Sequence, residues 1–138
     1  MEKCNDDDVV ISGIAGRFPE SDDVNELWNN LMSGEELSTI DERRWPLDVF
    51  DIPKRSGKIK NLEKFDADYF SIKEQDAHCM DPQIRLLHET TWEAIFDAGI
   101  NPDDLRGSKT SVCVGACFQD TLLAIMQNFE MENSMQTA

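Results

Sequence analysis

The sequence predicts an α/β fold in which strands and amphipathic helices alternate. Two short β-branched runs each end at a glycine, and two longer segments carry apolar residues at helical spacing. The chain of 138 residues is 40% hydrophobic and 30% charged, a composition typical of a globular domain of ordinary size. Because β-branched runs favour buried strands, and helices between strands favour a layered arrangement, the strands are expected in one mixed or parallel sheet.

The first strand is expected at residues 9–16, where valine, isoleucine and alanine dominate a run closed by glycine. A helix is expected next, over residues 24–32, because its apolar residues recur on one face. The polar turn at residues 20–23 offers N-cap candidates, and Gly34 supplies the stop.

A long loop is expected between residues 41 and 60, since proline and glycine interrupt every periodic pattern there. Its apolar members, such as Trp45 and Phe50, indicate that it packs on the body of the domain. The aromatic segment at residues 65–70 is expected to form a short helical turn that lays its rings on the core.

The clearest helix is predicted between Asp81, an N-cap, and Gly99, a left-handed stop, with Pro82 in the first turn. Its apolar face is broad, which predicts burial between two layers. Its acidic seam, expected to be solvated, consists of Glu89, Glu93 and Asp97.

After a turn at residues 101–107, a second buried strand is expected at residues 110–116 and a weak helix at residues 119–132. An open α/β sheet normally has more than two strands, and two cannot bury these helices. We therefore expect the domain to continue beyond Ala138.

The charge balance argues against nucleic acid and anionic membranes as partners. The chain has 28 acidic and 13 basic residues, a net charge of −15, which repels phosphate at long range. Seven of the basic residues fall within residues 43–64, which leaves open a solvated loop or a local positive patch. Neither a membrane span nor a secretory signal is evident, so a cytoplasmic location is expected.

No catalytic, cofactor-binding or metal-binding residue is expected in this chain. The glycine pair Gly13 and Gly16 lacks the third glycine of a dinucleotide fingerprint. The cysteines show no disulfide framework and are expected as free thiols. The weak candidates for a zinc site are His78, Cys79, His88, Cys113 and Cys117.

The candidates for a thiolate and base pair are Cys113 or Cys117 with His78 or His88. Cys113 alternates within an apolar strand, so we predict a buried thiol without a nucleophilic role. Cys117 follows the strand and leaves a functional contact open. His88 is expected to pack near the apolar helix face, and His78 to be exposed.

Several segments together resemble the β-ketoacyl synthases, in that family's order and spacing. They are VVISGIAGRFP at residues 9–19, NELWNNL at 25–31, MDPQIRLL at 80–87, WEAIFDAGI at 92–100, and VCVG at 112–115. The segment DERRWP at 41–46, with the following basic loop, is similar to the animal fatty acid synthase branch. The resemblance covers residues 9–120, after an acidic tail at 1–8, and is weak over 121–138.

The resemblance implies the N-terminal portion of a thiolase-like layered α/β fold, incomplete in this chain. It implies a parent enzyme that condenses an acyl thioester with malonyl-acyl carrier protein. That parent would use phosphopantetheine-linked substrates and would form a homodimer. That family's nucleophile lies in an Asp-Thr-Ala-Cys-Ser-Ser motif that this sequence lacks, as it lacks both later histidines. We therefore expect an inactive fragment. A short, catalytically dead interaction piece and a polyketide synthase fragment remain alternatives.

Overall fold

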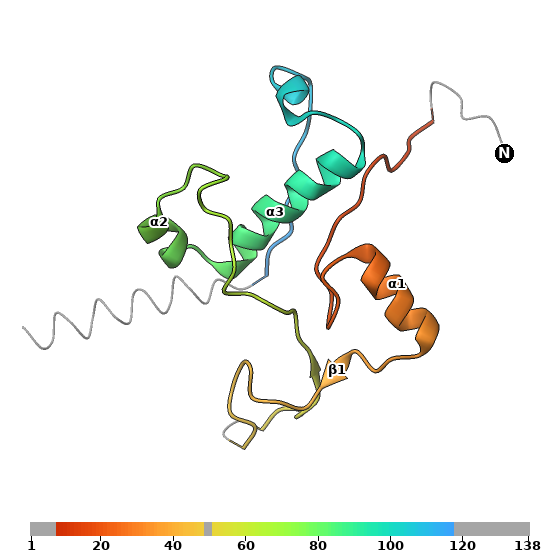
Figure 1. Ribbon diagram of the computed structural model, residues 1–138, viewed down its shortest axis with the longest axis vertical. Coiled ribbons are helices and arrows are strands. Elements are labelled where there is room, and N and C mark those ends of the chain that lie inside the picture. The colour runs from red at the N-terminus through yellow and green to blue at the C-terminus, as the bar shows by residue number, and fades with distance from the viewer. Residues whose placement is uncertain (1–7, 49–50, 118–138) are drawn as a thin grey trace, which may run out of the picture.

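The computed structural model describes residues 8–48 and 51–117. Figure 1 shows the helix α3 (Pro82–Asp97) at the centre of the described chain. The helix α1 (Val24–Ser33) and the paired strands β1 (Ser38–Thr39) and β2 (Ser56–Gly57) lie to one side of it. The short helix α2 (Glu74–Cys79) and the 3-10 helix η1 (Pro102–Leu105) flank α3 near its two ends.

Both predicted helices are confirmed, together with their caps. The Asp23 carboxylate accepts the backbone N–H of Glu26 at 2.8 Å at the start of α1, and Gly34 ends that helix with a φ of 75°. The Asp81 carboxylate accepts the N–H of Gln83 at 2.8 Å at the start of α3, and Gly99 follows that helix with a φ of 70°. Side-chain acceptors satisfy free N–H groups, and glycine adopts the left-handed turn without a Cβ clash.

The prediction of strands at residues 9–16 and 110–116 is wrong, since the structure forms no strand there. Residues 9–16 and 110–116 run as extended chain without a ladder, and the only sheet found in the described ranges is the antiparallel pair β1–β2. Val9 is 101% exposed and Val112 is 82% exposed. A β-branched run becomes a strand only when a neighbour accepts its backbone hydrogen bonds, and no described segment does so.

The expected burial of α3 between two layers is also not found. Phe96 is 73% exposed and Ile84 is 48% exposed, and among the described residues the one buried hydrophobic side chain is that of Ala77. The predicted helix at residues 119–132 lies outside the described residues. Because so few apolar side chains are fully buried, polar contacts also join the described segments to one another.

One side of α3 does carry an aromatic cluster, as predicted for residues 65–70. The rings of Phe65 and Phe70 stack at 5.4 Å, and Phe70 lies 5.3 Å from the imidazole of His88. Tyr69 meets Trp92 edge to face at 5.1 Å. Such pairs favour a fixed approach of the loop to the helix.

The predicted loop at residues 41–60 contains the strand β2, and its contact with β1 includes a buried lysine directly after β2. Trp45 is half-buried, in line with the expectation. Lys58 is only 3% exposed, and its ammonium donates to the carbonyl and hydroxyl oxygens of Thr39 at 2.9 and 3.2 Å. These bonds satisfy a buried cation that would otherwise be costly.

The N-terminal segment lies so close to α3 that Gly13 leaves no room for a side chain. A Cβ at this position would come within 2.1 Å of the Ala94 carbonyl oxygen and 2.7 Å of the Ala98 nitrogen. The N–H of Ile14 also donates to the Asp97 carboxylate at 2.9 Å. The segment and the helix are thus in direct backbone contact.

We expect Gly13→Ala to lower the opening free energy of α3 amides by about 1–3 kcal/mol, because the backbone must move apart to admit the methyl group. Native-state hydrogen exchange measures this quantity residue by residue. Gly115→Ala is the matched control, since a Cβ there meets nothing within 4 Å. Equal protection of α3 in both variants would contradict the close contact.

Candidate functional site

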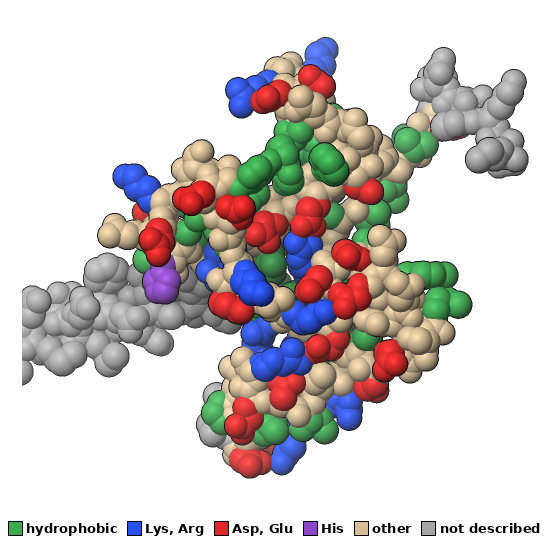
Figure 2. Space-filling model, in the orientation of Figure 1, with side chains coloured by type: hydrophobic (Ala, Val, Ile, Leu, Met, Phe, Trp, Pro, Cys, Tyr) green, Lys and Arg blue, Asp and Glu red, His purple; other side chains and the backbone are tan. Residues whose placement is uncertain are grey.

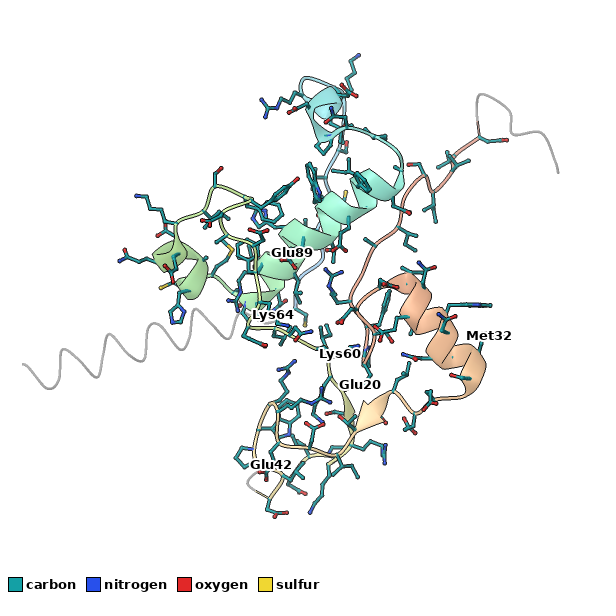
Figure 3. The ribbon with its side chains drawn as sticks, in the orientation of Figure 1. Glu20, Met32, Glu42, Lys60, Lys64 and Glu89 are labelled. Carbon is teal, nitrogen blue, oxygen red and sulfur yellow. The ribbon has the colours of Figure 1, made fainter. Side chains whose placement is uncertain are left out.

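A charged hollow lies where four segments of the chain meet. It encloses about 500 Å³ between the N-terminal segment, the start of α1, the chain that follows β2, and α3. Figure 2 shows acidic and basic side chains intermixed over this face of the molecule. Figure 3 shows Lys60, Lys64 and Glu89 near the middle of the molecule, where the chain after β2 approaches α3.

Arg17 makes a two-bond contact in the hollow. Its two terminal nitrogens, Nη1 and Nη2, donate to Oε2 and Oε1 of Glu93, each at 2.6 Å, and Nη2 lies 3.7 Å from Glu89. The Arg17 side chain is 17% exposed. A planar guanidinium fits a carboxylate in this two-bond geometry, and the hydrogen bonds that Arg17 donates to Glu93 raise the pKa of Arg17.

Lys60 makes a second link across the hollow, toward the start of α1. Its ammonium donates to both carboxylate oxygens of Glu26 at 2.9 and 3.1 Å and lies 3.5 Å from Asp22. The N–H of Asp22 also donates to Glu26 at 2.6 Å. This N–H bond, and then the Lys60 bond, lower the pKa of Glu26; the Glu26 bond raises that of Lys60.

A third link joins the turn before α1 to the chain after β1. Arg43 donates to Glu20 and to Asp41, the latter at 2.9 Å. The hydrogen bond from Arg43, followed by that from Thr39, lowers the pKa of Asp41. The hydrogen bond to Asp41, followed by that to Glu20, raises the pKa of Arg43. Arg43, Lys58 and Lys60 each face an acidic side chain, so this part of the basic run is neither a solvated loop nor a positive patch.

These pairs were missed by sequence reasoning, which treated Glu89 and Glu93 as a solvated seam. That expectation is wrong for Glu93, which binds Arg17 from 76 positions away. A signal was present in the spacing, because acidic residues on one helix face present a continuous surface to a cation. The sequence does not reveal which cation reaches it.

The predicted thiol and imidazole candidates do not come together. The thiol of Cys113 is exposed, which corrects the expected burial: its segment has no covering layer within the described residues. Cys117 is exposed as well. His78 is exposed on α2, as expected, and His88 packs against the aromatic cluster, also as expected, although the residue is exposed.

In residues 8–48 and 51–117, no group of three or more histidine, cysteine, aspartate or glutamate side chains is placed to hold a metal ion. No described helix is both long and apolar enough to cross a membrane. The ion pairs of Arg17 and Lys60 in the hollow link the N-terminal segment to α3 and the chain after β2 to α1.

The chain belongs to the β-ketoacyl synthase family. The model of the β-ketoacyl synthase N-terminal domain matches residues 6–138. Fatty acid synthase of the goose Anser anser anser is 48% identical over 124 residues, which are 90% of this chain and 35% of the goose sequence. A probable polyketide synthase of Dictyostelium discoideum is 37% identical over 140 residues, 95% of this chain and 4% of that one.

The solved structures agree with this family. The ketosynthase from module 6 of the bacillaene synthase of Bacillus subtilis matches with a TM-score of 0.63 and 34% identity, over 67% of this chain and 17% of that one. The predicted fold class, the N-terminal portion of a thiolase-like layered α/β fold, is therefore confirmed. The chain spans only a small part of the ketosynthase chain that it matches.

We expect Arg17→Lys to lower the opening free energy of amides in α3 by about 1–2 kcal/mol, because lysine cannot donate two parallel bonds to Glu93. Hydrogen exchange of α3 measures the loss. Arg106→Lys is the control: its partner is Asp103 and its side chain is 84% exposed. A loss of the same size in both variants would show that the Arg17 geometry is unimportant.

We expect the Glu26 carboxyl to titrate below its ordinary value of 4.5, since its charged form is the one that is bound. A lowered folded-state pKa stabilises the fold above the ordinary value, and this stabilisation is lost as the pH falls through the lowered pKa. Carboxyl NMR titration measures the midpoint. Lys60→Met should move it upward but not fully to 4.5, because the Asp22 N–H remains; an unchanged midpoint would contradict the Lys60 link.

Proposed function

We propose that this chain is part of a condensing enzyme of fatty acid synthase type. The proposed reaction joins an acyl thioester to a malonyl group carried on acyl carrier protein, in the cytoplasm. The observation that carries the proposal is the 48% identity to goose fatty acid synthase over 90% of the chain. The polyketide synthase relatives support the alternative product class less strongly, at 34–38% identity.

The part played by these residues is structural in this proposal. Arg17 of the N-terminal segment pairs with Glu93 of α3, and Lys60, after β2, pairs with Glu26 of α1. The nucleophilic cysteine and the two histidines of the family are in none of the motifs of this sequence. We therefore assign the acyl transfer step to the rest of a ketosynthase domain, which acts on phosphopantetheine-linked substrates as a homodimer.

A chimera tests the proposal. The segment of goose fatty acid synthase that aligns with this chain is replaced by the residues of this chain, and condensation of acyl and malonyl thioesters is measured. We expect a rate within about tenfold of the parent enzyme, equivalent to about 1.4 kcal/mol in barrier height. The matched control carries the aligned segment of the Dictyostelium polyketide synthase, which should support a lower rate.

Three further measurements sharpen this test. The isolated 138-residue chain should form no covalent acyl adduct by mass spectrometry, and Cys113→Ala in the chimera should leave the rate within about twofold. If the first chimera does not fold, a second chimera that carries only residues 80–117 of this chain provides the test instead. Folded, dimeric chimeras without condensing activity would overturn the proposal, as would an acyl adduct on the isolated chain.

A further inference from the structure

A second hollow borders the ion-paired one and shares Asp23 and Glu93 with it. It encloses about 480 Å³ between residues 14–16, the start of α1, and the last two turns of α3. The exposed apolar side chains along it are Phe96, which is 73% exposed, and Ile14, which is 57% exposed. We call this hollow the Phe96 groove.

The charged side chains that line the Phe96 groove are all acidic: Asp23, Glu93 and Asp97. Arg17 occupies both oxygens of Glu93. Asp97 accepts the N–H of Ile14 but makes no ion pair with any residue that the structure describes, so its charge is not neutralised there. The groove is therefore negative.

The end of α3 adds to this negative potential. Asp97 is the last residue of a helix of 16 residues, and the last turn of that helix contains no basic residue. The final carbonyl groups of a helix carry a partial negative charge that favours a nearby cation. Two independent features, the carboxylate and the helix end, therefore favour positive charge at the same end of the groove.

The aromatic side chains give the groove an apolar wall. Tyr69 holds Trp92 edge to face at 5.1 Å, which fixes one ring of the lining. Phe96 is left exposed beside Asp97, one residue away on the helix. An aromatic face next to a carboxylate suits a long cationic side chain, because the aliphatic stem packs on the ring while the charged head reaches the acid.

We propose that the Phe96 groove docks a protein segment in which a lysine or arginine stands beside an aliphatic residue. Charge complementarity selects this partner, since the carboxylates repel anionic lipid and nucleic acid. The aliphatic residue covers Phe96 and Ile14, and the cation lies at Asp97. This docking site goes beyond the proposed condensing activity and does not depend on it.

The test uses a fluorescent amphipathic peptide of lysine and leucine, with a control peptide in which glutamate replaces every lysine. Binding is measured on the 138-residue chain and on the goose chimera. Asp97→Asn keeps an acceptor for the Ile14 N–H and should weaken binding about threefold to fivefold. Phe96→Ser should weaken it about tenfold, as loss of one buried aromatic anchor does.

Matched controls separate the groove from the overall charge of the chain. Asp104→Asn removes an equal charge in η1, and Met32→Ser removes an apolar side chain that is 67% exposed on α1. Both should leave the affinity within about twofold, whereas 0.5 M salt should weaken the wild-type complex several-fold. Equal losses in test and control variants would overturn the proposal and indicate nonspecific attraction to an acidic chain.

The chimera distinguishes a true surface from one that the rest of the domain covers. Binding of the peptide to the folded chimera, lost with Phe96→Ser, supports the proposal. Binding to the isolated chain alone would overturn it, because the groove would then be internal to the complete domain. Sedimentation that shows self-association abolished by Phe96→Ser would also overturn it, in favour of a second copy as occupant.

Discussion

The two-bond contact between Arg17 and Glu93 is the interaction on which the described arrangement depends. It fixes the N-terminal segment to α3 across 76 positions, with both bonds at 2.6 Å. Fully buried apolar groups are few, since Ala77 is the single buried hydrophobic residue that the described ranges contain. Where an apolar core is thin, the geometry of charged pairs decides which segments lie together.

The parts of the fold that local chemistry determines could be predicted from the sequence. Asp23 and Gly34 mark the ends of α1, and Asp81 and Gly99 mark those of α3. A cap needs only an acceptor or a glycine within one turn of the helix end, so its signal is complete in a few residues. The family motifs are equally local, which is why the family was predictable too.

The parts that depend on distant partners could not be predicted. Residues 9–16 have the composition of a strand, yet a strand also needs a neighbour to receive its hydrogen bonds. Cys113 is exposed for the same reason, since its burial required a covering layer. The pairing of Lys60 with Glu26 spans 34 positions, and nothing in the sequence distinguishes Lys60 from the other basic residues of its loop.

The close approach at Gly13 bears on how the chain is made in the cell. The neighbouring hydrogen bond, from Ile14 to Asp97, joins residues 83 positions apart, so the N-terminal segment leaves the ribosome long before α3 exists. At about 5–20 residues per second, the segment waits for about 4–17 s before its contact residues in α3 are made. During that interval a chaperone that binds extended apolar chain has first access to it. The order of synthesis therefore delays the contact between the N-terminal segment and α3 until α3 has been made.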